Sequence, residues 1–200
     1  MSTRFLLLRH GQIKANVVQR WHGSTDSPLT WRGRRQARRT GKHLQRHREL
    51  TAVYASPLQR CQNTASLASK HTQLDIETID GLQEMSIGEW EDMPFRELVD
   101  RHDFIRRSTQ DIYHAAPQGE CLADVAARVT EAFRDIDARH ADDETVLVVS
   151  HGVALAVAMA TFLHDAPAKW VDYHFHNCSL TEFELSPEPV IHSYNEHAHL

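Results

Sequence analysis

Two short apolar runs, far apart in the chain, constrain the fold more than any other feature. Residues 5–8 read Phe-Leu-Leu-Leu, and residues 145–149 read Thr-Val-Leu-Val-Val. Continuous runs of this kind are typical of strands buried on both faces, as in parallel sheets covered by helices. Each run is followed closely by the same dipeptide, His10-Gly11 in the first case and His151-Gly152 in the second. Because open α/β sheets bind ligands at the carboxyl ends of their strands, we expect both imidazoles to face one pocket.

The rest of the chain alternates between strand-like and helix-like patterns, which favours an α/β domain. The strand-like segments are short, and they are residues 51–55, 75–79, 178–185 and 189–194, the last two forming a closing hairpin. Helical periodicity marks residues 30–49, 121–136 and 153–163, with shorter helical pieces over 94–113. A further helix is predicted after the strand at 51–55, with Ser56 at its N-cap and Pro57 at its first position.

Length and composition fit one globular domain over residues 1–200. The chain is 41% hydrophobic and 24% charged, and no linker or repeat divides it. Its net charge of −5 gives no overall attraction to nucleic acid or to an anionic membrane, so we expect neither as a partner. It has no apolar run of about 18 residues, no signal-peptide pattern and no Cys-x-x-Cys pair among its three cysteines. We therefore expect a cytoplasmic protein with reduced thiols.

The predicted helix over residues 30–49 is strongly basic. Its cationic side chains are Arg32, Arg34, Arg35, Arg38, Arg39, Lys42, Arg46 and Arg48. Such a helix can bind nucleic acid, but the negative net charge and the lack of interleaved aromatic residues favour a solvated face. The acidic stretch between Asp75 and Asp103 could also balance it.

Arg60 is a candidate for the pocket because of its place in the predicted helix after residues 51–55. A basic side chain is unfavourable in the first turn of a helix, where the helix dipole is positive. It therefore needs an anionic partner, and either a bound phosphate or a surface carboxylate would serve.

Five blocks of residues follow one another along the chain. They are Arg9-His10-Gly11 with Asn16, residues 26–30 with Gly33, Gln36 and Ala37, Ser56-Pro57-Leu58-x-Arg60 with Thr64-Ala65, Leu82-x-Glu84 with Gly88-x-Trp90-Glu91, and Ser150-His151-Gly152. Together they resemble the motifs of the histidine phosphatase superfamily, which has the phosphoglycerate-mutase-like fold. The resemblance extends over essentially the whole chain. It implies a three-layer α/β/α domain with a mostly parallel central sheet.

The resemblance also implies phosphoryl transfer through a phosphohistidine. His10 would attack phosphorus in line, and Glu84 would give the leaving alcohol its proton. Arg9, Arg60 and a protonated His151 would bind the phosphate oxygens. Further substrate contacts are implied for Asn16, His22, Gly23, Gly152 and Glu120. We expect no cofactor and no metal ion, because the chain shows no motif with metal-ligand spacing.

Four residues depart from the family pattern, and they leave the specificity open. They are Ile13 in place of a hydroxyl residue, His22 in place of glutamine, Asp92 in place of glycine and Cys121 in place of serine. We expect these positions to contact the non-phosphate part of the substrate.

The function that the resemblance favours is hydrolysis of a small phosphorylated metabolite, because residues 82–90 and 195–200 look like those of the branches that act on α-ribazole phosphate or on a broad range of esters. The alternatives are a phosphoglycerate mutase and a non-catalytic member that binds phosphoproteins. The length of the chain favours the phosphatase, because family mutases tend to be longer. The oligomeric state stays open, with a dimer as one possibility.

Overall fold

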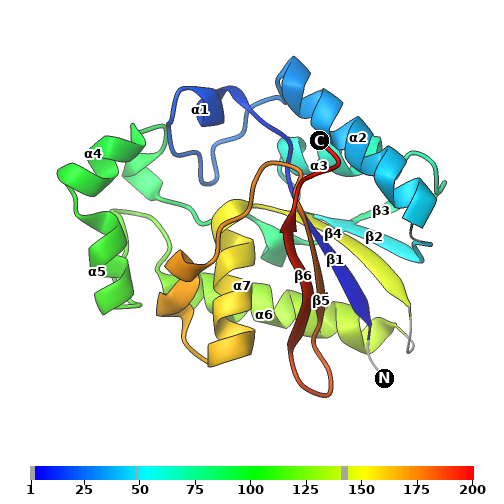
Figure 1. Ribbon diagram of the computed structural model, residues 1–200. Coiled ribbons are helices and arrows are strands. Elements are labelled where there is room, and N and C mark those ends of the chain that lie inside the picture. The colour runs from blue at the N-terminus through cyan, green and yellow to red at the C-terminus, as the bar shows by residue number, and fades with distance from the viewer. Residues whose placement is uncertain (1–2, 48, 141–143) are drawn as a thin grey trace.

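Six strands form one central sheet in the computed structural model, which describes residues 3–47, 49–140 and 144–200. The strands are β1 (Arg4–Arg9), β2 (Ala52–Ala55), β3 (Ile76–Thr78), β4 (Thr145–Ser150), β5 (Leu180–Glu184) and β6 (Val190–Glu196). Their order is β3-β2-β4-β1-β5-β6 (Figure 1). The four strands from β3 to β1 pair in parallel, whereas β5 pairs antiparallel with both β1 and β6. The predicted mostly parallel sheet is thus confirmed.

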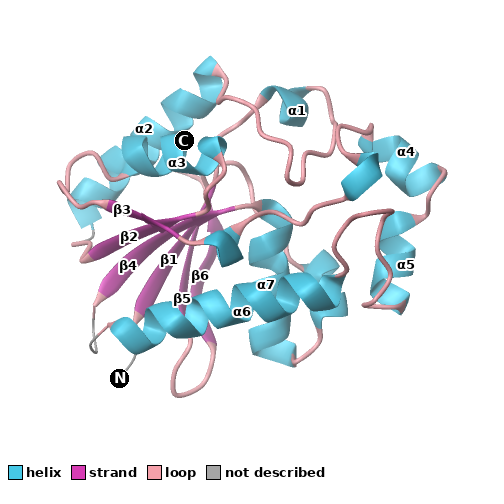
Figure 2. Cartoon of the chain, turned by 180° about the vertical axis from the view of Figure 1, so that it is seen from behind, coloured by secondary structure: helices cyan, strands magenta, loops and turns pink. Residues whose placement is uncertain are grey.

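Helices cover both faces of this sheet. The α-helices are α1 (Lys14–Val17), α2 (Trp31–His47), α3 (Gln59–Ala68), α4 (Phe95–Asp100), α5 (Phe104–Gln110), α6 (Leu122–Arg139) and α7 (Gly152–His164), with 3-10 helices η1 (Asp80–Leu82), η2 (Gly88–Trp90) and η3 (Pro167–Asp172). Helices α2 and α3 lie on one face and α6 and α7 on the other (Figure 2). Alternate side chains of β1 show this directly: Phe5 and Leu7 pack with α6 and α7, whereas Leu6 and Leu8 pack with α2 and α3. The fold is therefore the expected three-layer α/β/α arrangement.

Two helix boundaries differ from the prediction. Helix α3 begins at Gln59 with Leu58 as its N-cap, not at Pro57. The Ser56 hydroxyl accepts only a long bond from the Leu58 N–H (3.4 Å) and lies 2.8 Å from His151 Nε2. Helix α2 is capped by Thr30 as expected, through a bond from the Gly33 N–H to its Oγ1. This helix ends at His47, and the predicted Arg48 lies outside the described residues.

The acidic stretch between β3 and α5 is used differently from what the sequence suggests. Its carboxylates pair with other partners: Glu77 with Arg139, and Asp92 with Arg20. These two carboxylates therefore do not pair with the basic helix α2. No described helix has both the length and the apolar character that a bilayer crossing requires.

Candidate active site

The ends of β1 and β4 bring the two His-Gly dipeptides side by side. In the parallel register Arg9 lies opposite Ser150, and the His10 N–H donates to the Ser150 carbonyl at 3.0 Å. The His10 and His151 rings meet edge to face with their centroids 5.3 Å apart. The two imidazoles therefore lie together, but only His10 lines the cavity, so the prediction that both face one pocket holds for His10 and not for His151.

His10 has the form that a nucleophile needs. Its Nδ1 lies 2.8 Å from the Gly11 carbonyl oxygen, which can only accept, so Nδ1 carries the ring hydrogen and Nε2 keeps its lone pair. Burial lowers the pKa of His10 well below its usual value, and the positive charges of Arg60 and Arg9 lower it further. The imidazole is therefore neutral at neutral pH.

His151 is fully buried and bonded to protein atoms at both ring nitrogens. Its Nδ1 accepts from Arg60 Nε at 3.2 Å, so Nε2 carries the hydrogen and donates to Ser56 Oγ. Burial lowers the pKa of His151 well below its usual value, with further contributions from Arg60 and His10. In this structure His151 is thus neutral, which differs from the protonated donor that the family resemblance implies.

Arg60 is also fully buried, behind the two histidines. Its N–H groups are directed at acceptors on protein atoms, and these are His151 Nδ1 (3.2 Å), the carbonyls of Thr25 (2.7 Å), Gly23 (2.7 Å) and His22 (3.4 Å), and Asp26 Oδ1 (3.4 Å). Arg60 therefore holds the loop over residues 22–26 against His151. To grip a phosphate as a bidentate fork, its guanidinium would have to exchange some of these carbonyls for phosphate oxygens.

Arg9, unlike Arg60, has a guanidinium N–H group without a hydrogen-bond partner among the described residues. Its Nη1 donates to the Phe175 carbonyl at 2.5 Å, while its buried Nε has no hydrogen-bond partner within the described part of the chain. A Cβ on Gly152 would lie 3.4 Å from Arg9 Cζ, so the guanidinium packs against the start of α7. An anion placed here would meet both the Arg9 charge and the positive end of that helix.

Glu84 occupies the N-terminus of α7. Its Oε1 accepts from the N–H of Ala154 at 2.9 Å and of Met85 at 3.1 Å, and its Oε2 accepts from the N–H of Val153 at 3.2 Å. The side chain thereby caps α7 from a segment about 70 residues earlier in the chain. Oε2 accepts only one N–H from the described residues, so it keeps a second lone pair that can carry the proton for a substrate.

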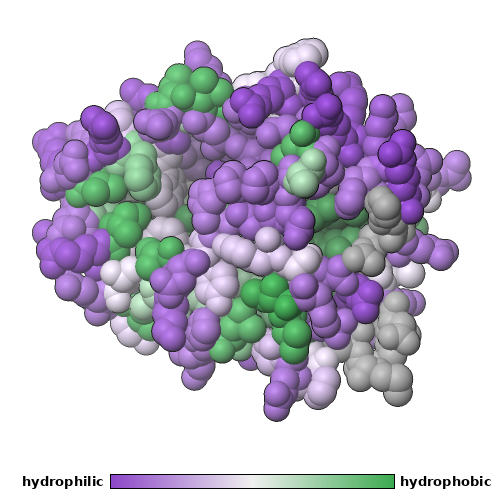
Figure 3. Space-filling view, in the orientation of Figure 1, coloured by the Kyte–Doolittle hydropathy of each residue, from purple (hydrophilic) through white to green (hydrophobic). Residues whose placement is uncertain are grey.

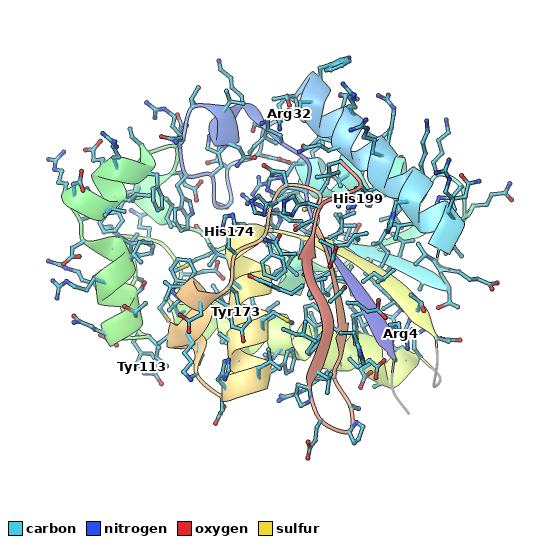
Figure 4. The ribbon with its side chains drawn as sticks, viewed as in Figure 1. Arg4, Arg32, Tyr113, Tyr173, His174 and His199 are labelled. Atoms are coloured by element: carbon cyan, nitrogen blue, oxygen red, sulfur yellow. The ribbon has the colours of Figure 1, made fainter. Side chains whose placement is uncertain are left out.

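A cavity of about 1060 Å³ opens beside these groups, and six of the predicted site residues line it: Arg9, His10, Asn16, His22, Glu84 and Gly152. Its other walls are largely apolar and include Trp21, Phe95, Val99, Ile105, Trp170 and Val171. Trp21 stacks on Phe95 with ring centroids 5.9 Å apart. Figure 3 shows the surface hollowed between the α4 side of the molecule and its centre, with hydrophobic side chains beside the hollow. Tyr173 and His174, labelled in Figure 4, come to the cavity on the segment after η3.

Two predicted substrate contacts lie away from the cavity wall. The Gly23 N–H donates to Glu91, and its carbonyl accepts from Arg60, so its backbone is used within the protein. Glu120 forms an ion pair with Arg128 at 2.6 Å. In this structure both residues therefore bond to other protein groups and do not line the cavity.

Several residues that organise the site were not predicted from the sequence. Asn177 donates to the His10 carbonyl at 3.0 Å and to Asn16 Oδ1 at 3.2 Å, and no motif in the sequence marks it. Glu91 accepts from the backbone N–H groups of residues 23, 24, 25 and 87. Burial acts to raise the pKa of Glu91, but these hydrogen bonds outweigh it and hold the pKa below its usual value. Glu91 does belong to a family block, which is the signal that could have found it.

The chain is also similar to known proteins. The sequence profile of the histidine phosphatase superfamily (branch 1) matches residues 5–197. The chain belongs to the histidine phosphatase superfamily. Among the residues that the structure describes, no group of three or more His, Cys, Asp and Glu side chains is placed to hold a metal ion.

Relatives within the superfamily carry several names. The bifunctional protein Rv2228c of Mycobacterium tuberculosis is 34% identical over 99% of this chain, which spans only 55% of the length of that protein. A protein of Enterobacter with the provisional name phosphoglycerate mutase GpmB is 30% identical over 94% of this chain and 87% of its own. Two solved structures are similar over 97–98% of both chains: YhfR of Bacillus stearothermophilus (35% identity, TM-score 0.86) and the alpha-ribazole phosphatase of Shigella flexneri (26%, 0.84).

Two departures from the superfamily pattern contact each other. His22 Nε2 lies 2.9 Å from Asp92 Oδ1, and Arg20 also pairs with Asp92 at 3.3 Å. Asp92 has a φ of +58°, in the left-handed region that favours glycine, which explains why glycine is common there. Ile13 and His22 line the cavity, as expected. Cys121 does not: it is the N-cap of α6, with its Sγ 3.0 Å from Asp124 Oδ2.

Proposed function

We propose that this protein is a phosphomonoester hydrolase that works through a phosphohistidine on His10. The observation that carries the proposal is a neutral imidazole with a free Nε2, placed beside the uncommitted donors of Arg9 in a large cavity. The names of relatives, among them an alpha-ribazole phosphatase, support the same reaction.

In the first step, Nε2 of His10 attacks phosphorus and the bond to the leaving oxygen breaks. Glu84 supplies the proton that this oxygen takes up. In the second step, water attacks the phosphohistidine, Glu84 takes the proton from the water, and phosphate leaves with His10 restored. The charges of Arg9 and Arg60 stabilise the transferring group, and for this reason we propose that the reaction is metal-independent.

The substrate that we propose is a small phosphorylated metabolite with an apolar organic part. The cavity extends from His10 to the stacked pair of Trp21 and Phe95, so there is room for much more than a phosphate. α-Ribazole phosphate and a broad range of esters both fit this description. The three buried, free cysteines suit a reducing compartment, and we propose a cytoplasmic location.

A generic aryl phosphate such as p-nitrophenyl phosphate tests the reaction. We expect hydrolysis that persists in excess chelator, because the Arg9 and Arg60 charges take the place of a metal ion. The measurement is initial rate with and without chelator. Activity that is lost on chelation and restored by Zn²⁺ or Mg²⁺ would contradict the metal-independent mechanism.

A phosphoglycerate mutase is the second candidate, and the resemblance to GpmB is the observation that favours it. The same preparation separates the two functions when 3-phosphoglycerate is supplied together with the bisphosphate primer. A hydrolase releases inorganic phosphate and forms negligible 2-phosphoglycerate. Rapid, primer-dependent isomerisation would replace the proposed function by this one.

Replacing Glu84 with glutamine should affect poor and good leaving groups unequally. An alkyl phosphate needs the proton, so its kcat/KM should fall about 10²-fold, while the kcat/KM of an activated aryl phosphate should be nearly unchanged, because this ratio reports the transfer step. The phosphohistidine should persist longer, because its hydrolysis has lost the base. Rapid-quench measurement of the adduct checks this, and an equal loss for both esters would show that Glu84 is not the acid.

A further inference from the structure

A half-buried ion pair links α6 to the segment that carries Glu84. Arg128 lies on α6, and Glu120 immediately precedes this helix. Both carboxyl oxygens of Glu120 accept from Arg128, with distances of 2.6 Å from Nε and 2.9 Å from Nη2. The two side chains are 23% and 27% exposed, so the pair is largely shielded from water. None of the sequence motifs includes Arg128.

The guanidinium of Arg128 uses all its hydrogen-bonding capacity in one place. Besides Glu120, it donates to three backbone carbonyls of a single segment. They belong to Gly81 (2.9 Å, from Nη1), Gln83 (2.7 Å, from Nη1) and Glu84 (3.2 Å, from Nη2). A guanidinium has five N–H groups, and these five bonds account for all of them. A lysine, with three donors on one atom, cannot reproduce this pattern.

The segment held in this way has little other regular structure. After the single 3-10 turn of η1, residues 83–87 form neither helix nor strand. Short contacts instead attach this part of the chain to α6 and to Glu120. The N–H of Ser86 donates to Glu120 at 2.8 Å, and a Cβ on Gly81 would lie 2.7 Å from the Arg128 carbonyl oxygen. Only glycine permits that approach.

Glu84 is consequently fixed from two sides. Its backbone carbonyl is bound by Arg128 of α6, while its carboxyl group is bound by the N-terminal N–H groups of α7. These two helices pack against each other on one face of the sheet (Figure 2). The position of the carboxyl group relative to His10 therefore depends on Arg128, although Arg128 is not among the residues that line the cavity.

We propose that Arg128 is a positioning residue, which holds Glu84 where it can transfer a proton to the leaving alcohol. This inference rests on the proposed function. Since a proton transfer requires the acid within hydrogen-bond reach of the leaving oxygen, a small shift of residues 83–86 impairs it while leaving His10 and Arg9 in place. Glu120 serves the same end by neutralising and orienting the guanidinium.

The test replaces Arg128 with lysine and measures kcat/KM, which reports the transfer step and not the later hydrolysis of the phosphohistidine, for a series of phosphate monoesters from an alkyl ester to 2,4-dinitrophenyl phosphate. We expect a loss of about 10- to 100-fold for the alkyl ester and less than about threefold for the activated one, because only the poor leaving group needs the acid. The matched control is Arg139→Lys on the same helix. Arg139 also binds a carboxylate through two bonds, to Glu77 at 2.7 and 2.6 Å, but on β3 and not on the Glu84 segment. We expect this control to change no rate.

A double variant separates positioning from general support of the fold. If Arg128 acts through Glu84, Arg128→Lys should cost no further leaving-group-dependent loss in a Glu84→Gln background. An equal loss for every ester, or full additivity in the double variant, would overturn the inference. Where Arg128→Lys does not fold, as judged by thermal unfolding, Glu120→Gln takes its place with the same expected pattern. The wild-type phosphohistidine is measured first, because its absence would contradict the proposed function itself and not this inference alone.

Discussion

Replacing His10 with alanine is expected to abolish turnover and the covalent phosphoprotein together. The loss should be at least about 10⁴-fold in kcat, because of the two buried histidines at the strand ends only His10 has a ring nitrogen with a free lone pair. A rapid acid quench of the wild-type enzyme with labelled substrate should trap phosphate on the protein. That adduct should be labile in acid and stable in base, as an N–P bond is and a phosphoserine is not.

The His10 variant also tests the non-catalytic alternative. His10 sits just past the end of β1, and its side chain is not part of the apolar clusters, so the variant should keep the thermal stability of the parent within a few degrees. A phosphoprotein-binding member would show no adduct even in the wild type. Turnover that survives in the variant, with phosphate trapped elsewhere, would show that the chemistry uses a different nucleophile.

The pH dependence of the wild type should agree with this assignment. The pKa of His10 lies well below its ordinary value of 6.5 in the folded protein, so the nucleophile stays neutral as the pH falls from 7 through 6.5. The value of kcat/KM should therefore not decline through protonation of a group near pH 6.5. A decline with that midpoint in the enzyme, but not in the uncatalysed hydrolysis of the same ester, would indicate that His10 is less shielded than the structure shows.

Changing Arg60 to lysine should be nearly as damaging, although it keeps the charge. The ammonium of lysine cannot reach His151, Thr25 and Gly23 together, so the loop over residues 22–26 and the tautomer of His151 would both lose their support. We expect kcat/KM to fall about 10²- to 10³-fold. The matched control is Arg35→Lys, at an exposed position on α2.

Steady-state kinetics with p-nitrophenyl phosphate provides the measurement for Arg60, and thermal unfolding shows whether the variant is folded. Arg60 is fully buried, so its loss of hydrogen bonds should also lower the melting temperature. Near-normal kcat/KM in a folded variant would mean that the bonds of Arg60 to His151 and to the loop have no part in catalysis.

The parts of the site that the sequence predicts are those attached to strong local patterns. His10 and His151 follow apolar runs whose buried, parallel pairing is almost dictated by their composition, and the family blocks add Glu84 and Arg60. Ser56 shows where local reasoning fails. The Ser-Pro pair is a good helix start, but α3 begins two residues later, at Gln59, and the serine hydroxyl bonds to His151, 95 residues away.

The residues that the sequence does not predict act through long-range contacts with backbone groups. Arg128 reaches carbonyls 44 to 47 positions earlier, and Asn177 reaches the His10 carbonyl across 167 positions. A backbone carbonyl has no side-chain signature, so no spacing rule can point to its donor. The same reason explains Glu120, whose place beside a family block suggested a substrate contact, although its partner is Arg128.

The strand order has a consequence for how the protein is made. β1 lies between β4 and β5, which begin at Thr145 and Leu180, so it is synthesised well before either neighbour. Until β4 has been translated, this strongly apolar segment has no neighbouring strand, and His10 has neither His151 nor the α7 terminus beside it. The nascent chain must therefore protect an exposed, aggregation-prone segment for many seconds, at a synthesis rate of about 5–20 residues per second. The catalytic site should become complete only after β4 has paired with β1 and β2 and Asn177, which binds the His10 carbonyl, has been synthesised.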